Sequence, residues 1–279
     1  MTYPGAVHRN SGGEAKIQSL TADRLDFLFS TRLLPCPYLP AREERKIVIG
    51  LAEDLAGGLA EDRAGGLAED RARGLAENRA GRDYTRLIRA GYRRSGVIAY
   101  RHACPTCRAC VPVRLPIAGF QPGKSLRRAE NINFDLDVRI LPPRAQADHF
   151  ELFRRYQDGR HTDGEMADMD FAEYRALVEE SPVATRVAEY RDPGGELMAV
   201  SLFDELDDSL SAVYTFFEPS EAKRSLGTFM ILWLARHARD AEKSHLYLGY
   251  WIENCAKMAY KARFRPLEML DRGVWQPML

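Results

Sequence analysis

The most regular hydrophobic pattern in the chain lies between residues 225 and 241. Apolar side chains recur there every three or four positions, which is the spacing of an amphipathic helix with one buried face. They are Leu226, Phe229, Met230, Trp233 and Leu234, and His237 continues the same stripe. We expect the helix to begin at Ser225 and to end near Ala241.

Branched and aromatic residues predict strands on both sides of this helix. The expected strands are at 185–190, 197–206, 210–217 and 245–252, with helices at 149–156, at 171–179 and from Asn254. Helices, a strand meander, a central helix and a further strand are the order of acetyl-CoA-dependent acyltransferases. The sequence therefore predicts an α+β fold whose C-terminal domain resembles the acyl-CoA N-acyltransferase (GNAT) fold.

The start of the central helix has the features of an anion site. Ser225 is a candidate cap, Gly227 lets a ligand approach the backbone, and Lys223 and Arg224 stand beside the helix end. Unpaired N–H groups and the positive end of the helix dipole favour a phosphate there. The phosphate loop of acetyl-CoA enzymes has Gly or Ala where this chain has Phe229, so we expect a different activated acyl donor.

Length and composition set the broad class. With 279 residues, of which 45% are hydrophobic, the chain can bury two moderate cores. We expect a flexible leader at 1–20, a smaller cysteine-bearing α/β domain at 21–140, and the GNAT-like domain at 141–279. The formal net charge of zero disfavours a protein that coats nucleic acid. The N-terminus lacks a secretory signal, and no apolar run reaches the roughly 20 residues that span a bilayer, so we expect a cytoplasmic protein.

An internal repeat of eight residues occupies 50–81. Its copies read GLAEDLAG, GLAEDRAG, GLAEDRAR and GLAENRAG. Eight residues advance a helix by about 800°, so the leucines drift around the helix and never build one face. The unit is also shorter than the repeats that stack into solenoids. We expect a surface insertion without a chemical role.

A group of cysteines is a candidate for metal or redox chemistry. Cys104, Cys107 and Cys110 form a C-x2-C-x2-C pattern, and Cys36 lies in a loop fixed by prolines. In a reducing compartment this spacing favours a structural or redox-sensing zinc or Fe–S site over a disulfide. The alternative is that these small residues only pack a tight turn. We expect the four sulfur atoms to converge, and Cys255 to be a buried small hydrophobic residue.

The Gly-Lys-Ser sequence at 123–125 is not a P-loop. The pattern requires a glycine where this chain has Ala118. Lys124, Arg127 and Arg128 are interpreted instead as a basic loop for a polyphosphate backbone, or as a solvated charge cluster.

Five sequence blocks, spread in order along the chain, carry a family signature. They are CPYLP at 36–40, YRRSGVIAYRHACPTCRACVPVR at 92–114, RHTDGEM at 160–166, RSLGTFMIL at 224–232, and YLGYWI to YKARF at 247–264. Together they resemble bacterial aminoacyl-tRNA protein transferases, relatives of the eukaryotic arginyl-tRNA protein transferases. The similarity is greatest to the leucyl-transferring branch, and the repeat insertion lies between the blocks.

The resemblance implies an enzyme that moves leucine from leucyl-tRNA to the α-amine of proteins beginning with Asp or Glu. This transfer marks the acceptor for degradation by the N-degron pathway. The implied partners are leucyl-tRNA and such proteins, without a membrane. The chemistry requires no cofactor, because the aminoacyl ester is already activated and the neutral amine is a good nucleophile. Positioning and charge stabilisation must then dominate catalysis.

The acceptor side needs a cation for the acidic side chain and a group that handles the amine. Arg93, Arg94 and Arg160 are candidates for the first role. His161 and Asp163 are the catalytic candidates that orient or deprotonate the amine, and Tyr214 is a weaker donor. The alternative for His161 and Asp163 is a packed imidazole and a turn-forming carboxylate.

The donor side is expected near the last block. Lys257, Tyr260 and Lys261 are expected to face the donor, and Tyr250 or Trp251 to stack on a terminal base unless Trp251 belongs to the core. The residues expected to wall the amino-acid pocket are Tyr214, Phe216, Phe229, Met230 and Ile231. Since none is a carboxylate that could pair with arginine, we expect leucine as the transferred residue.

Three alternatives remain open at this point. The first is an arginyl-tRNA protein transferase, which differs only in the donor. The second is an acetyl-CoA-dependent N-acetyltransferase, which Phe229 disfavours. The third is a non-enzymatic module that binds a metal and RNA, which the acyltransferase-like half disfavours.

Overall fold

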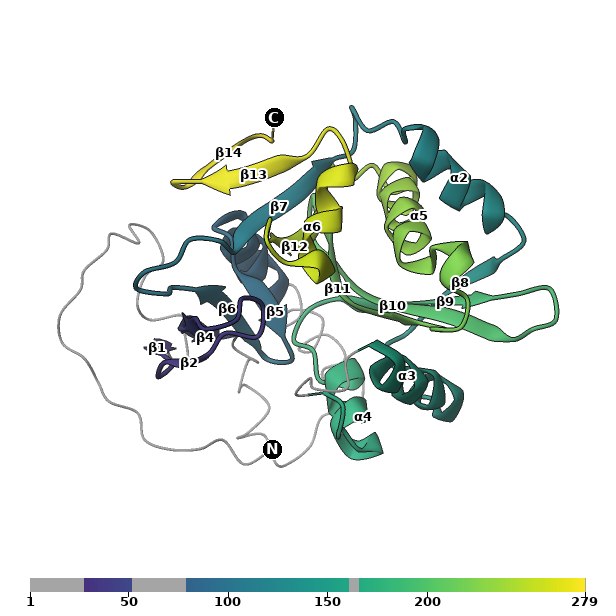
Figure 1. The fold of residues 1–279 in the computed structure, drawn as a ribbon, viewed down its shortest axis with the longest axis horizontal. Coiled ribbons are helices and arrows are strands. Elements are labelled where there is room, and N and C mark those ends of the chain that lie inside the picture. Colours follow the sequence, from purple (N-terminus) through teal and green to yellow (C-terminus); the bar gives the residue numbers. More distant parts are fainter. Residues whose placement is uncertain (1–27, 52–78, 161–165, 279) are drawn as a thin grey trace, which may run out of the picture.

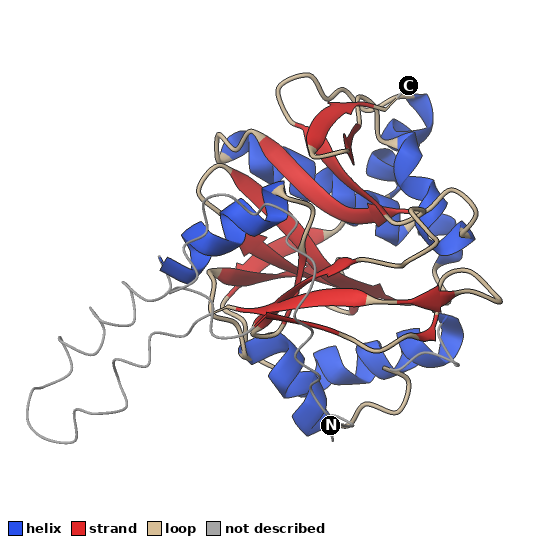
Figure 2. Cartoon of the chain, turned by 90° about the vertical axis from the view of Figure 1, so that its left-hand side faces the viewer, coloured by secondary structure: helices blue, strands red, loops and turns tan. Residues whose placement is uncertain are grey.

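The protein has a mixed α+β fold built on two main sheets, with a third of only two short strands (Figures 1 and 2). The computed structural model describes residues 28–51, 79–160 and 166–278. The leader at 1–20, nearly all of the repeat, and the catalytic candidates His161 and Asp163 lie outside the described residues. The predicted α+β class and the GNAT-like order of the C-terminal elements are confirmed.

The smaller sheet contains N-terminal strands in the antiparallel order β1-β4-β6-β5. Its strands are β1 (Leu28–Ser30), β4 (Lys46–Gly50), β5 (Arg93–Ser95) and β6 (Ile98–His102). Cys36 lies in the turn between two short strands, β2 (Leu34–Pro35) and β3 (Glu43–Glu44). A helix at 79–89 supplies Tyr84, Leu87 and Ile88 to the core of this lobe. Tyr247 of the larger sheet belongs to the same core, so the two lobes share buried contacts.

The larger sheet has eight strands in the order β14-β13-β7-β12-β11-β10-β9-β8. They are β7 (Val111–Pro116), β8 (Asp137–Leu141), β9 (Thr185–Arg191), β10 (Leu197–Glu205), β11 (Ser209–Phe217), β12 (His245–Trp251), β13 (Glu268–Asp271) and β14 (Val274–Pro277). The four strands predicted around the central helix are confirmed. The domain boundary at 140/141 stays a prediction, and β7 and most of β8, which precede it, belong to this larger sheet.

Helices cover both faces of the larger sheet (Figure 1). On one face, α2 (Lys124–Ile132) and α5 (Leu226–Asp240) pack into one core. On the other face, α3 (Ala147–Arg160) and α4 (Phe171–Glu179) pack into a second core. The predicted basic loop is therefore wrong, because Lys124, Arg127 and Arg128 lie in α2, whose Leu126 and Ala129 are buried. No helix in the described parts of the chain is long and apolar enough to cross a membrane.

The pairing of β11 with β12 positions the site. These strands are parallel, joined through α5, and their register runs only from Ser209↔His245 to Ser211↔Tyr247. Both strands continue beyond the last pair, β11 to Phe217 and β12 to Trp251. The register of β12 against β7 shifts between Tyr247 and Gly249, which is the position where the partners separate. Two short helical segments, α6 (Ala256–Ala259) and η4 (Tyr260–Arg263), follow β12.

Candidate active site

Arg93 of β5 lies between β11 and β12 where their pairing has ended. Its guanidinium donates to the carbonyl oxygen of Ala212 and, at 3.5 Å, to the hydroxyl of Ser211, both on β11. On the β12 side it lies against Gly249, where an added Cβ would be 3.0 Å from the Arg93 Cζ. Gly249 also has φ +78°, a conformation that favours glycine. In the described chain, no carboxylate forms an ion pair with Arg93.

Lys261 of η4 lies beside β12 and close to Arg93. Its Nζ donates to the carbonyl oxygen of Tyr250 at 2.6 Å and lies 3.7 Å from the sulfur of Met258. The pKa of Lys261 is lowered to about 7, mainly by burial and also by the charge of Arg93, while Cys255 raises it. No acidic side chain of the described residues pairs with this ammonium. Two cations thus lie close together where β11 and β12 separate, a place called the opening below, and neither has an acidic partner among the described residues.

The neighbouring Arg94 has a structural role, which corrects its interpretation as a reader of substrate carboxylates. It is 4% exposed and donates two hydrogen bonds to Asp204 of β10, at 2.9 and 2.7 Å. Further N–H groups donate to the carbonyl of Gly96 at 2.8 Å and to the Thr185 hydroxyl at 3.2 Å. This bidentate pair links the smaller sheet to the larger one. It also occupies the N–H groups of Arg94 that could otherwise bind a ligand carboxylate.

The start of α5 differs from the prediction in two respects. Ser225 has φ 53° and ψ 43°, and its side chain makes no capping hydrogen bond. Arg224 donates to both carboxylate oxygens of Asp135, at 2.9 and 2.6 Å, and so holds η3 (Ala222–Arg224) against the turn after α2. The side chains of Ser225 and Arg224 are therefore not arranged as a phosphate seat.

A different basic residue lies near this helix end. The Cζ of Arg160 is 5.2 Å from the centre of the Phe217 ring. Phe217 in turn touches Gly227, where an added Cβ would lie 3.1 Å from the ring. Lys223 is exposed next to the same turn. Arg160, Gly227 and Lys223 are thus brought together, and phosphate binding there stays a prediction.

Two tyrosines lie on elements that flank the opening, Tyr214 on β11 and Tyr260 in η4. Tyr214 of β11 accepts a hydrogen bond from the Nε2 of Gln157 at 2.7 Å. Burial raises the pKa of Tyr214 well above its usual value, and Tyr156 raises it further. Burial also raises the pKa of Tyr260 to about 12, again with a contribution from Tyr156. These phenols stay protonated near neutral pH, so neither is a base there.

The two aromatic residues predicted to stack on a base are held by the protein. Tyr250 is buried, its hydroxyl donates to the carbonyl of Gly91 at 3.1 Å, and its ring lies 4.8 Å from that of His102. The Trp251 indole donates to the carbonyl of Ala259 at 3.2 Å and packs against the core. The stacking interpretation of Tyr250 is therefore wrong, and the core alternative for Trp251 is confirmed. Lys257 is exposed on α6.

The predicted leucine pocket is not one continuous wall. Tyr214 and Phe216 belong to the core beneath α3 and α4, whereas Phe229, Met230 and Ile231 belong to the core beneath α2 and α5. The sheet separates these groups, because Tyr214 and Phe216 share one face of β11, whereas α5 packs on the opposite face.

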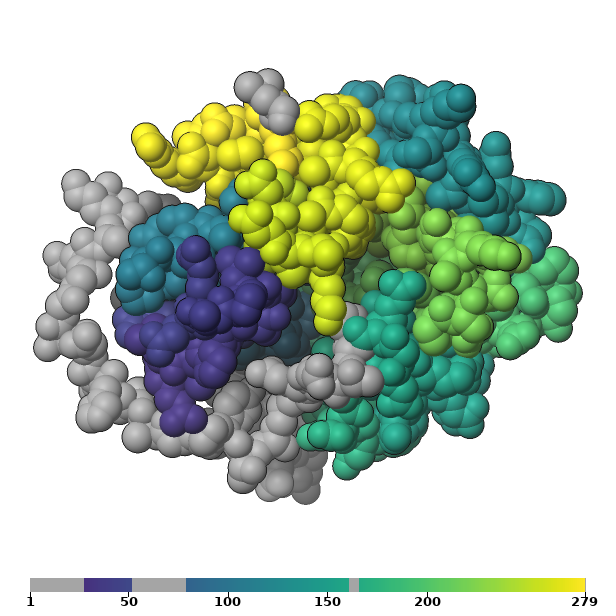
Figure 3. Space-filling model, in the orientation of Figure 1, coloured from purple at the N-terminus to yellow at the C-terminus, as the bar shows by residue number. Residues whose placement is uncertain are grey.

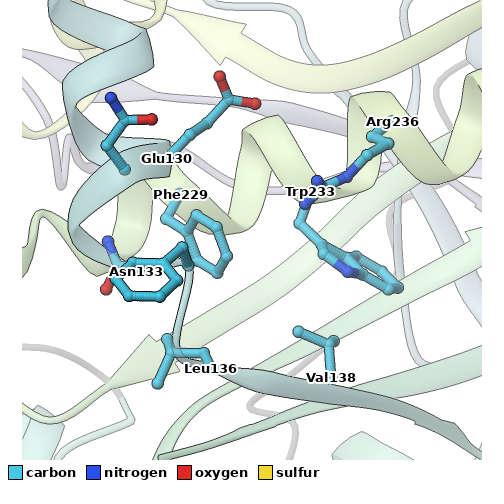
Figure 4. Close-up of a pocket in the computed structure, with 9 residues that line it drawn as sticks. Glu130, Asn133, Leu136, Val138, Phe229, Trp233 and Arg236 are labelled. Carbon is cyan, nitrogen blue, oxygen red and sulfur yellow. The ribbon is translucent and has the colours of Figure 1, made fainter.

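Phe229 lines a separate cavity of about 460 Å³ between α2, α5 and β8. Figure 4 shows Phe229 and Trp233 of α5 facing the same space as Leu136 and Val138, with Arg236 at the rim. Apart from Phe229, none of the predicted site residues lines this cavity.

The four N-terminal cysteines share one neighbourhood. The pKa of Cys110 is raised to about 12, mainly by burial and in smaller part by Cys104, Cys36 and Cys107. All four are free thiols. Sulfur atoms around one zinc ion lie roughly 3.8 Å apart, whereas no three of these sulfurs all lie within 4.8 Å of one another in the described structure. This arrangement does not form a coordination sphere, so metal binding stays a prediction. Cys255 is buried as predicted.

Among the described residues, Asp148, His149 and Glu189 do bring three possible metal-ligand atoms within 4.8 Å of one another. Arg191 pairs with Asp148 and Glu189, each at 2.6 Å, and His149 Nε2 lies 2.9 Å from Glu189. The arginine already neutralises these carboxylates, so we interpret the group as an ion-pair network. The sequence analysis missed both this network and Gly249, although an isolated glycine in a strand-like segment is a recognised signal of close backbone approach.

On the face shown in Figure 3, the yellow C-terminal segment lies between the purple N-terminal strands and the green and teal helices of the larger sheet. Arg93 from the smaller sheet and Lys261 from the C-terminal segment meet where β11 and β12 separate. Such a site, formed by cations and tyrosines, suits the positioning of an anionic acceptor and an activated ester.

Comparison with known proteins identifies the class. Models of the arginine-tRNA-protein transferase N terminus and C terminus match residues 34–128 and 148–271. A protein of Gluconacetobacter diazotrophicus called aspartate/glutamate leucyltransferase is 44% identical over 255 residues, covering 91% of this chain and 89% of the relative. One of the same name from Paramagnetospirillum magneticum is 45% identical over 253 residues, covering 91% and 94%. The chain is an aminoacyltransferase. It belongs to the arginine-tRNA-protein transferase family.

Solved structures show only distant likeness. L-PGS from Bacillus licheniformis has 13% identity and a TM-score of 0.46, over 61% of this chain and 59% of that chain. FemX has 8% identity and a TM-score of 0.40, over 80% and 79%. The fold is therefore defined by the order and pairing of its own strands.

Proposed function

We propose that this protein transfers leucine from leucyl-tRNA to the α-amine of proteins whose first residue is Asp or Glu, and so marks them for degradation. The observation that carries this proposal is Arg93, a half-buried arginine that lies in the opening without an acidic partner in the described chain. The names of the relatives agree with leucine as donor and with an acidic acceptor. We place the reaction in the cytoplasm, where charged tRNAs are found.

Arg93 is proposed to bind the side-chain carboxylate of the acceptor. A guanidinium offers two parallel N–H groups to a carboxylate, and a partly dehydrated site strengthens that contact. Its present bonds go to Ala212 and Ser211 on one side, and Gly249 lets it approach β12 on the other. An acceptor with a neutral first residue would leave the arginine unpaired, which gives the site its selectivity.

The donor ester is proposed to lie along β11, toward the start of α5. Arg160 and Lys223 supply positive charge for the tRNA backbone at that end. Tyr214, which stays protonated, lies between this end and Arg93 and can donate to the ester oxygen. The amine then attacks the ester carbonyl, the amide bond forms, and the ribose oxygen of the tRNA leaves.

The test is a transfer assay with purified protein, separately charged leucyl-tRNA and arginyl-tRNA, and peptides that begin with Asp, Glu, Asn or Ala. We expect leucine transfer to Asp and Glu peptides only. Preferential arginine transfer would overturn the donor assignment, and equal use of Asn and Asp would overturn the acceptor assignment.

The role of Arg93 is tested by R93M. Losing one partner of a desolvated charge pair costs about 2–5 kcal/mol, so kcat/KM for the Asp peptide should fall at least 30-fold. The ratio of kcat/KM for the Asp peptide to kcat/KM for the Asn peptide should fall as well. The matched control is R139M, since Arg139 on the edge strand β8 is exposed and pairs only with Asp137 among the described carboxylates.

A further inference from the structure

Lys261 is an anomaly in the described structure. It is 7% exposed, and a buried ammonium normally has a carboxylate beside it. Its two contacts are instead the carbonyl oxygen of Tyr250 at 2.6 Å and the sulfur of Met258 at 3.7 Å. A neutral amine has two N–H groups and one lone pair. These contacts accept both N–H groups and leave the lone pair for a third group, so the surroundings suit the neutral form.

The charges around Lys261 also favour the neutral form. Arg93 from β5 is a fixed positive charge that opposes protonation, and Cys255 before α6 is the other titratable group that acts on this amine. Burial lowers the pKa of Lys261 most, Arg93 also lowers it and Cys255 raises it, and the net value is about 7. A group that titrates near the operating pH is present as a base and can also return its proton.

The reaction needs such a group. The α-amine of a protein, with a pKa of about 7.7–8.0, arrives largely as an ammonium ion, which has no lone pair for attack. Only a short carbon link joins the α-nitrogen of Asp or Glu to the side-chain carboxylate. An acceptor whose carboxylate lies on Arg93 therefore has its α-nitrogen near that arginine, whose charge acts on Lys261.

We propose that Lys261 is the catalytic base that removes a proton from the α-ammonium of the acceptor. This inference rests on the proposed transfer of an amino acid to that amine. The Lys261 amine takes one proton, the freed amine attacks the ester carbonyl, and the bond from the carbonyl carbon to the ribose oxygen breaks. Lys261 returns its proton to that oxygen, giving the ribose hydroxyl. The second proton of the attacking nitrogen leaves to solvent, so each turnover forms one amide and releases one proton.

The experiment compares K261Q and K261R with the wild type in the donor and acceptor pair that the wild type uses best. Both variants keep an N–H donor for the Tyr250 carbonyl, and neither can act as a base near pH 7. We expect kcat/KM to fall by about 10² to 10⁴. The matched control is K243Q, because the Lys243 ammonium also bonds only backbone carbonyls among its recorded contacts, those of Leu206 and Asp207 at 2.8 and 3.2 Å.

Two further readouts separate catalysis from structure. In the wild type, log kcat/KM should rise with pH as Lys261 becomes neutral and fall again as the peptide amine loses the proton that Lys261 removes, whereas in K261Q it should only rise, as the peptide amine becomes neutral. In K261A, added methylamine should restore transfer in proportion to the concentration of its neutral form. The proposal is overturned if K261Q or K261R keeps wild-type activity, or if both limbs persist in K261Q. If the wild type transfers no amino acid from any charged tRNA, the proposed function itself fails and this inference fails with it.

Discussion

The adjacent residues Arg93 and Arg94 are expected to respond to substitution in opposite ways. In R94M, Asp204 would keep its buried position, where its side chain is 0% exposed, but would lose both guanidinium bonds. Among the described side chains, the Thr185 hydroxyl, at 2.7 Å, would then be the remaining donor to the Asp204 carboxylate. Removing one partner of a buried ion pair costs about 3–5 kcal/mol, because the other charge stays dehydrated.

This loss is a large part of the total stability of a protein, which is usually about 5–15 kcal/mol. At about 2–4 °C per kcal/mol for a domain of this size, the melting temperature should fall by roughly 6–20 °C. Urea unfolding followed by tryptophan fluorescence measures the free energy directly. The double variant R94M/D204L should recover most of the loss, since apolar side chains of similar size often replace a buried pair at little cost.

R93M is the matched comparison, because Arg93 pairs with no described carboxylate and its loss leaves no buried charge. It should keep most of the stability and lose selectivity for acidic acceptors. If R94M instead unfolded like the wild type and lost the preference for Asp over Asn, Arg94 would be the acceptor-reading residue and the structural role argued from its pairing would be wrong.

Three other perturbations test separate parts of the structure. In G249A, the new Cβ would lie 3.0 Å from the Arg93 Cζ, in a backbone conformation that costs about 1–2 kcal/mol, so transfer to Asp peptides should fall roughly tenfold. G195A is the control, since Gly195 has φ +85° and an added Cβ there meets nothing within 4 Å; equal losses in the two variants would refute displacement of Arg93. For Lys261, the folded pKa of about 7 lies below the usual value of 10.5, so between these values the unfolded chain binds the additional proton. The free energy of unfolding of the wild type, measured relative to K261M, should therefore rise with pH from about 7 toward 10; parallel pH profiles would contradict the burial of this amine. Deleting one octapeptide, residues 58–65, should change transfer less than twofold, because loop-closure entropy depends only weakly on length, by about 0.6 kcal/mol per doubling. L51A, by contrast, should cost about 2–5 kcal/mol, since Leu51 is buried in the smaller core; a deletion that stopped transfer at unchanged stability would give the repeat a function.

Periodicity and composition determined the regular elements of this protein. The stripe from Leu226 to Leu234 predicts the central helix because an amphipathic face depends only on local spacing, and α5 follows it closely. The same holds for the strands around it. The family blocks indicated the class of enzyme, because they preserve residues across the whole chain in order.

Tertiary structure alone decided what the individual side chains of the site do. Arg93 and Arg94 are equivalent in the sequence, but successive residues of a strand face opposite sides, so one enters the opening and the other meets Asp204 from a strand more than a hundred residues away. The packing of α5 on the face of the sheet opposite to Tyr214 and Phe216 divides the predicted leucine wall between two cores. The lowered pKa of Lys261 arises from burial and from Arg93, which is distant in the chain. Dehydration and long-range contacts are properties of the packed molecule, and local sequence spacing carries no record of them.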